Sequence, residues 1–374
     1  MTKPVNHKDK NLPIIQSMID NFELQWNNIA LIGNRGHQNF WDELILIGNI
    51  KLIDTTYHSR YDELATNKSD HNTSSKPPKL IIYTANIPWL RWFHSYFNIS
   101  WSRLIYTQEL PHGFRSLLHY IFNPSCIKDI KYWFMTDTYI LGGGEIFTPE
   151  TPFSYQYRTI SLMPYFFGKL FWWMRWCRPR LIVMWGIQKP TRWIDRVCFW
   201  LIWRCTDRFY LRDKESIEVI HTTRPYKEAS VFVDSSYFAV SDICKKNSDE
   251  KIAIFNTNPL SDNFDTTISK IVEYSGRWYK VYFLPAYFTT HGAQDDMSVY
   301  DKVCVALWDA DIDLQLLDWR DWDRFLDIFV KADFVYASRL HIYIVARLIG
   351  LDIEPFKYQK KLQKMIDMLD SVWL

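Results

Sequence analysis

The chain has 374 residues, 48% of them hydrophobic and 23% charged, a balance that excludes a disordered or fibrous protein. Lysine and arginine (44) nearly balance aspartate and glutamate (42), so the charge gives no indication of a nucleic-acid partner. Aromatic residues make up 17% of the chain, which indicates large buried rings, an aromatic surface, or both.

The six cysteines form no CxxC pair, and their spacing matches neither a zinc site nor a disulfide framework. The first residues are polar and lack the apolar core of a secretion signal. The longest apolar stretch, about 162–177, contains Lys169 and Arg175 and is shorter than the roughly 20 residues that span a bilayer. We therefore expect a cytoplasmic protein without a metal site.

Apolar runs and helical patterns alternate along the first two thirds of the chain. The segment 14–26 and the segment following Gly33 predict helices. Predicted strands, several running into glycine-bearing or polar loops, lie at 29–33, 80–85, 138–147, 180–189, 207–216 and 228–236.

A polar break at 241–250 separates this region from a second alternation. The predicted elements there are strands at 251–258 and 278–287, helices at 265–275 and 320–332, a strand–turn–helix at 333–351, and a final amphipathic helix. The pattern predicts an α/β protein with two Rossmann-like domains facing a cleft, residues 1–246 and 247–374.

Ligands of such sheets bind beyond the carboxyl ends of the strands, so the residues after each strand are the candidates. Asn39, Asp42 and Glu43 lie where a glycine-bearing loop enters a helix. A helix cap is the simpler interpretation, and an anion-binding loop is the alternative. The loop is not GxGxxG, so a dinucleotide fingerprint is excluded.

Gly142, Gly143 and Gly144, followed by Glu145, come directly after an apolar run. Three successive glycines are costly in backbone entropy. Two explanations remain open, the close approach of a ligand and the crossing of a neighbouring helix.

Basic residues follow two further predicted strands. Arg212 precedes Asp213 and Ser216, and its guanidinium could bind a carboxylate or phosphate, or belong to a capped surface charge cluster. Arg339 and His341 flank Leu340 after the run 333–337, which favours anion binding combined with proton transfer. Lys361 lies in a basic segment that is typical of a solvated helix face.

The order of these motifs is more specific than any one of them. In sequence they are G-x-x-G-x-x-N-x-x-D-E from Gly33, L-G-G-G from Leu141, G-I-x-x-P from Gly186, R-D-x-x-S from Arg212, V-x-x-D from Val231 and S-R-L-H from Ser338. This order, over about Ile29 to Leu369, resembles the polysaccharide pyruvyl transferase family.

The resemblance implies a fold like that of GT-B glycosyltransferases. It also implies transfer of an enolpyruvyl group from phosphoenolpyruvate to a sugar of a cell-surface polysaccharide or its lipid-linked precursor, which forms a pyruvate ketal and releases phosphate. No cofactor or metal is implied. The C-terminal domain would bind the donor, with His341 as general acid and Arg212 and Arg339 as the other catalytic residues. The implied donor-binding residues are Arg212, Arg339, Leu340, His341 and Lys361.

The N-terminal domain would lie on the acceptor side. Its candidate loop residues are Asn39, Asp42, Glu43, Gly142, Gly143, Gly144 and Glu145. Trp41 and Glu145 replace glycines that are usual in the family, so we expect the donor to be retained and the acceptor to differ. A GT-B glycosyltransferase using a nucleotide sugar and a non-catalytic sugar-binding homologue are the alternatives.

The segment 162–204 concentrates Trp and Phe beside Lys and Arg. Two core-packed helices would explain it. Peripheral contact of residues 164–203 with the inner face of the membrane, or stacking on sugar rings, is the alternative.

Overall fold

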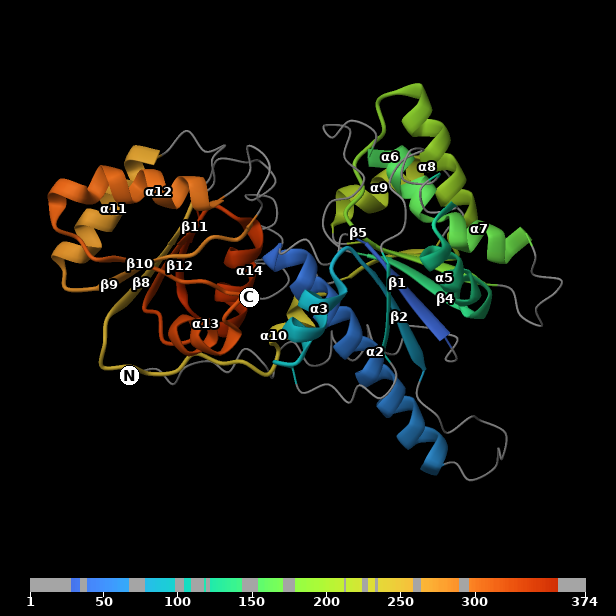
Figure 1. The fold of residues 1–374 in the computed structure, drawn as a ribbon, viewed down its shortest axis with the longest axis horizontal. Coiled ribbons are helices and arrows are strands. Elements are labelled where there is room, and N and C mark those ends of the chain that lie inside the picture. Colours follow the sequence, from blue (N-terminus) through green and yellow to red (C-terminus); the bar gives the residue numbers. More distant parts are fainter. Residues whose placement is uncertain are drawn as a thin grey trace. The chain divides into compact units, whose positions relative to one another are not determined.

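The computed structural model gives the architecture of most of the chain (Figure 1). It describes residues 28–33, 39–66, 78–97, 104–108, 118, 122–142, 154–170, 179–211, 213–223, 228–232, 235–257, 264–288 and 296–355. The predicted helix at 14–26 and the predicted C-terminal helix lie outside these residues.

The chain divides into two compact units that are not continuous in sequence. The first comprises Met1–Gly36, Asn49–Leu90 and Ile99–Ser235, and the second comprises His37–Gly48, Arg91–Asn98 and Ser236–Leu374. The assignment of an acceptor side to 1–246 and a donor side to 247–374 stays a prediction.

The first unit contains a parallel sheet with the strand order β3-β2-β1-β4-β5-β6-β7 among its described residues. The strands are β1 (Asn28–Ile32), β2 (Lys79–Thr84), β3 (Leu104–Gln108), β4 (Thr138–Gly142), β5 (Arg180–Trp185), β6 (Arg208–Leu211) and β7 (Ala229–Val231). Strand residues alternate between the two faces. Both faces of the central strands are buried, which explains the continuous apolar runs of the sequence.

Among the described residues, five helices cover one face of this sheet. They are α5 (Pro124–Met135), α6 (Ser154–Ser161), α7 (Met163–Leu170), α8 (Trp193–Cys205) and α9 (Lys214–Thr223). Tyr165, Phe199 and Trp203 from these helices join Tyr139 and Leu181 of the strands in one core. Part of the aromatic segment 162–204 is therefore core, as the first interpretation expected.

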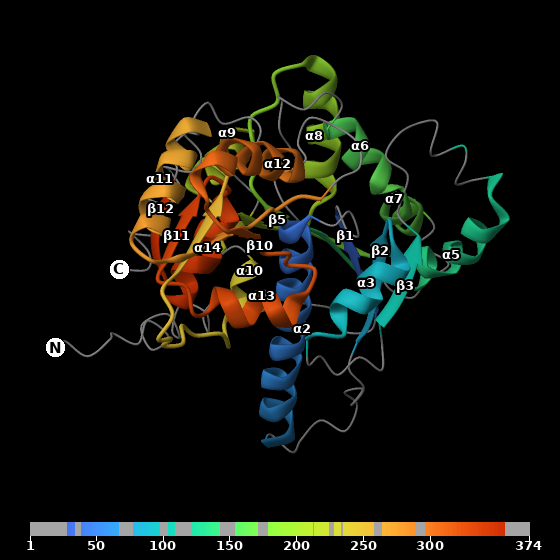
Figure 2. The same ribbon diagram turned by 60° about the vertical axis from the view of Figure 1, so that its left-hand side comes forward.

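The second unit contains a smaller parallel sheet with the order β10-β9-β8-β11-β12 (Figure 2). Its strands are β8 (Ile252–Asn256), β9 (Lys280–Phe283), β10 (Leu314–Leu316), β11 (Phe334–Ala337) and β12 (Asp352–Pro355). Its own helices are α10 (Ser236–Val240), α11 (Phe264–Gly276), α12 (Asp296–Leu307), α13 (Trp322–Phe329) and α14 (Leu340–Ile349). The 3-10 turn η2 (Trp308–Ala310) follows α12.

Two helices contribute to the second unit from earlier in the chain. These are the start of α2 (Phe40–Thr66) and the end of α3 (Ile87–His94). Their rings join an aromatic cluster formed by Phe40, Phe93, Phe97, Trp319, Trp322 and Phe325. The ring centroids of Phe40 and Trp319 are 5.3 Å apart, and those of Phe97 and Trp322 are 4.8 Å apart. These six aromatic side chains are buried outside the segment 162–204.

The predicted α/β class with two Rossmann-like parallel sheets is confirmed. The sequence analysis missed the short strands β3, β10 and β12. No helix among the described residues is both long enough and apolar enough to cross a membrane.

Candidate functional site

The second sheet reverses its strand order between β8 and β11, and this is where open parallel sheets bind ligands. Asn256 is the last residue of β8, and Ser338 and Arg339 directly follow β11. Because all strands here are parallel, their carboxyl ends meet at one edge of the sheet.

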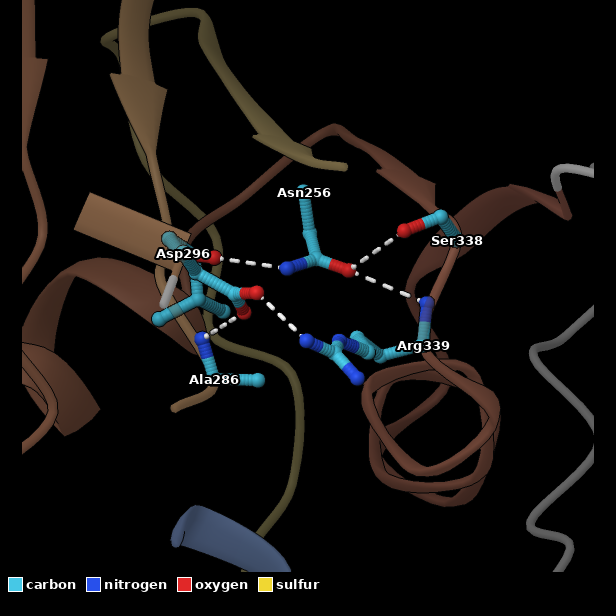
Figure 3. Close-up of polar contacts among 6 residues, drawn as sticks. Asn256, Ala286, Asp296, Ser338 and Arg339 are labelled. Atoms are coloured by element: carbon cyan, nitrogen blue, oxygen red, sulfur yellow. Dashed lines mark hydrogen bonds and ion pairs between the residues drawn. The ribbon is translucent and has the colours of Figure 1, made fainter. Parts of the chain in front are cut away.

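A single buried amide ties these strand ends together (Figure 3). Asn256 Nδ2 donates to the carbonyl oxygen of Leu284, which follows β9, at 2.8 Å. Its Oδ1 accepts from the backbone N–H of Arg339 at 3.0 Å and from the hydroxyl of Ser338 at 3.2 Å. Asn256 therefore fixes the backbone from which the Arg339 side chain projects.

Arg339 is also held through its side chain. Its Nη2 donates to Oδ1 of Asp296, the first residue of α12, at 2.5 Å. The other carboxylate oxygen of Asp296 accepts from the N–H of Ala286 at 2.9 Å. Burial raises the pKa of Asp296, and the Arg339 guanidinium and the Ala286 and Tyr287 backbones only partly offset this.

The guanidinium of Arg339 retains unused hydrogen-bonding capacity. Its Nε is buried and has no hydrogen-bond partner within the described part of the chain. The side chain is still 22% exposed, whereas Asp296 is fully buried. One nitrogen is thus fixed by Asp296 while the rest of the fork can bind an anion.

Helix α14 begins at the same edge. Arg339 is its N-cap residue, with extended backbone, and the Arg339 side chain makes no capping hydrogen bond. The half-buried His341 and the buried Leu340 lie in that turn. The structure thus brings together three of the predicted donor residues, Arg339, Leu340 and His341, at the positive end of a helix.

The start of α2 packs beside this group within the second unit. Phe40 N–H donates to the carbonyl oxygen of Ala286 at 3.1 Å, and Asn39 forms an isolated antiparallel bridge with Tyr287. Asn39 Nδ2 donates to Asp42 at 2.9 Å. Asp42 and Glu43 are buried, while Asn39 is partly exposed.

Gly142, the last residue of β4, lies in the first unit against α2. A Cβ at this position would lie 3.2 Å from Nδ2 of Asn49. For Gly142, the crossing of a neighbouring helix is therefore a sufficient reason for glycine.

Several predicted site residues lie outside the described residues, namely Arg212, Lys361, Gly143, Gly144 and Glu145. The residues after Arg212 are described and have structural contacts. Asp213 accepts from the N–H of Ser216 at 2.7 Å at the start of α9, and Ser216 Oγ accepts from the N–H of Ile187 at 2.8 Å. The capping interpretation thus accounts for Asp213.

Sequence reasoning missed Asn256 and Asp296. A polar residue closing the apolar run 252–255 was a visible signal for Asn256. Nothing local distinguishes Asp296 from the acidic residue before it. No group of three or more His, Cys, Asp or Glu that could hold a metal occurs among the described residues.

The fold and this site define a class of two-sheet α/β enzymes that resemble GT-B proteins. The chain aligns with UDP-GlcNAc 2-epimerase from Neisseria meningitidis bound to UDP-GlcNAc at 11% identity and a TM-score of 0.56, over 91% of this chain and 85% of that one. It aligns with HepE from Anabaena in complex with UDP and glucose at 11% identity and a TM-score of 0.52, over 90% and 82%. At 11% identity, these structural likenesses show only a shared fold.

A family model for polysaccharide pyruvyl transferases matches residues 42–348. The chain belongs to the polysaccharide pyruvyl transferase family, as its motif order indicated. A comparison with curated proteins gave no match.

Proposed function

We propose that the protein transfers the enolpyruvyl group of phosphoenolpyruvate to a sugar and closes it into a pyruvate ketal. The observation that carries the proposal is the position of Arg339. Asn256 and Asp296 hold it at the strand-order reversal, and Leu340 and His341 follow it in the first turn of α14.

Donor binding follows from the charges at this edge. Phosphoenolpyruvate carries a carboxylate and a phosphate on one carbon centre, and a guanidinium fork suits either group. The first turn of α14, which the Arg339 side chain does not cap, adds backbone N–H groups and a favourable dipole. Arg212 and Lys361 are proposed as further contacts to the donor.

In the proposed reaction, protonated His341 gives its proton to the methylene carbon of the donor. The carbon bearing the phosphate becomes oxocarbenium-like, and a sugar hydroxyl adds to it and passes its proton to the now neutral His341. Phosphate then leaves with the electron pair of its bond to carbon, and Arg339 stabilises its charge. The carbon is again oxocarbenium-like, so a second hydroxyl of the sugar adds to it, gives its proton to the released phosphate and closes the ketal.

The proposed acceptor is a sugar of a cell-surface polysaccharide or its lipid-linked precursor, reached from the cytoplasm. Among Asn39, Asp42 and Glu43, only Asn39 is exposed enough to meet a hydroxyl. Asp42 orients it through the hydrogen bond to its amide. We therefore assign acceptor contact to Asn39 and a positioning role to Asp42.

Phosphate release from phosphoenolpyruvate, measured with a panel of soluble and lipid-linked sugars, tests the activity. His341→Ala should reduce turnover by about 10²–10⁴-fold, the usual contribution of a general acid, and leave donor binding intact. Arg339→Ala should instead weaken donor binding. The exposed His58, on α2, gives a matched control in His58→Ala, which should leave turnover unchanged.

Near-normal turnover in His341→Ala would remove this residue as the acid. Absence of phosphate release with every acceptor would contradict the proposed activity.

The second candidate is a GT-B glycosyltransferase using a nucleotide sugar, favoured by the likeness to structures solved with UDP-GlcNAc and with UDP. Thermal stabilisation separates the two, because a ligand that binds the folded state raises its melting temperature. Stabilisation by phosphoenolpyruvate and not by UDP-sugars supports pyruvyl transfer. Stabilisation by neither ligand would favour the third alternative, a non-catalytic sugar-binding homologue.

A further inference from the structure

Helix α8 is apolar on two faces, although a surface helix ordinarily has only one such face. Phe199, Ile202 and Trp203 anchor it in the core of the first unit, where it packs beside α6 (Figure 1). The ring of Phe199 meets that of Tyr155 on α6 edge to face, with centroids 6.3 Å apart. The orientation of the helix is therefore fixed by its buried side.

The opposite side carries large apolar residues into solvent. Trp193 is 75% exposed, Val197 47%, Trp200 41% and Leu201 36%. At 3.6 residues per turn these four positions lie on one face of the helix, with Ile194 at its border. We call these five residues the α8 face. Single exposed apolar residues are ordinary, but a continuous group of them marks an interaction site.

The exposed polar residues of α8 itself are both arginines. Arg196 and Arg204 are exposed on the helix, and the exposed Arg192 directly precedes it. The guanidinium of Arg204 lies 5.5 Å from the centre of the Trp200 ring. The acid of this helix, Asp195, is buried and accepts from Gln156 at 2.9 Å, so it does not neutralise the surface.

Every exposed position of α8 is therefore apolar or arginine. Tryptophan and arginine together favour the headgroup region of a bilayer, where the ring enters the apolar boundary and the guanidinium meets phosphate. A second copy of the chain is a poorer occupant. Symmetric contact of this face with itself would bring the arginines of both copies together.

We propose that the α8 face docks the protein on the surface of a bilayer that contains anionic phospholipid. Docking would bring the protein close to the proposed lipid-linked acceptor. Docking itself does not require the pyruvyl transfer reaction. Docking and pyruvyl transfer can therefore fail separately.

Flotation with vesicles tests the proposal. Wild-type protein should float with vesicles of phosphatidylcholine and phosphatidylglycerol mixed two to one, and bind pure phosphatidylcholine much more weakly. Trp193→Glu combined with Val197→Glu should reduce binding roughly tenfold or more, because charge replaces buried apolar surface. Trp308→Glu is the matched control, since Trp308 is a more exposed tryptophan on η2 of the second unit. It should bind as the wild type does.

Arg192→Gln and Arg196→Gln should each weaken binding about fivefold, and added salt should weaken it for the wild type. A melting temperature equal to that of the wild type shows whether each variant is intact. Failure of the wild type to float with anionic vesicles would overturn the proposal, as would unchanged flotation of the Trp193→Glu, Val197→Glu protein. A dimer in sedimentation that this double variant dissociates would assign the face to a second copy instead.

Discussion

Both sheets have an edge at which the strand order reverses, and the two edges differ in their hydrogen bonds. Each reverses its strand order once, between β1 and β4 in the larger sheet and between β8 and β11 in the smaller one. A buried asparagine lies at or near each reversal. Asn256 makes three hydrogen bonds at the smaller sheet, whereas Asn49 is 1% exposed and neither polar atom of its amide has a partner within the described residues.

Among the described residues, this contrast separates an asparagine that joins strand ends from one that is only tightly packed. At the smaller sheet the amide bonds convert strand ends into a fixed support for Arg339. At the larger sheet, a Cβ at Gly142 would lie only 3.2 Å from Asn49 Nδ2. The Asn49 amide makes no hydrogen bond to the described residues. Preorganisation of this kind is what a site for a small charged donor requires.

The largest effect is expected for Asn256→Leu. It leaves the Leu284 carbonyl, the Ser338 hydroxyl and the Arg339 N–H without their partner, and each buried unsatisfied group costs about 1–3 kcal/mol. Urea denaturation should show a loss of about 3 kcal/mol or more, and donor binding should weaken with it. A change below about 1 kcal/mol would mean that the amide does not hold the edge.

Gly142→Ala should have a smaller effect at the other edge. The new methyl group would lie 3.2 Å from Asn49 Nδ2, so the Asn49 side chain must move slightly, and crowding of this kind costs about 1 kcal/mol. Combining it with Asn49→Ala should recover most of the loss. Strict additivity of the two changes in urea denaturation would contradict this account.

Asn49→Leu should change the free energy of unfolding by less than about 1 kcal/mol, and in the stabilising direction. The substitution removes a buried amide without hydrogen bonds and nearly conserves volume. Its matched partner is Asn256→Leu, the same change at the organised edge. Equal destabilisation by both substitutions would remove the distinction between the edges.

The smallest effect concerns the pH dependence supplied by Asp296. Because burial raises the pKa of Asp296 in the folded state above its ordinary 3.8, the folded protein binds this proton more tightly than the unfolded chain does. The contribution of this tighter proton binding to the free energy of unfolding is fully present below pH 3.8. It is lost as the pH rises through the raised pKa of Asp296. The wild type should therefore lose melting temperature relative to Asp296→Asn as the pH rises through this window. A difference that does not vary with pH would contradict the raised pKa.

Much of this molecule could be predicted from local pattern. Long buried strands such as β1 and β4 are continuous apolar runs, and Arg339 and His341 are visible because they follow such a run. Strand β3 was missed because it lies at the sheet edge, mostly half-buried, where the apolar signal is weak.

The rest depends on distance along the chain. Asn256 meets Ser338 across 82 residues, and Asp296 meets Arg339 across 43. No local periodicity encodes such pairs. The aromatic cluster was likewise hidden, because its rings come from three separate segments.

The aromatic cluster has a consequence for modular use of the chain. The second unit cannot be excised at Ser236, since such a fragment would lack Phe40, Phe93 and Phe97 and leave Trp319 and Trp322 uncovered. A grafted or separately expressed second unit would have to carry the stretches 37–48 and 91–98 with it. Exchange of second units between relatives by simple end-to-end recombination is thereby disfavoured.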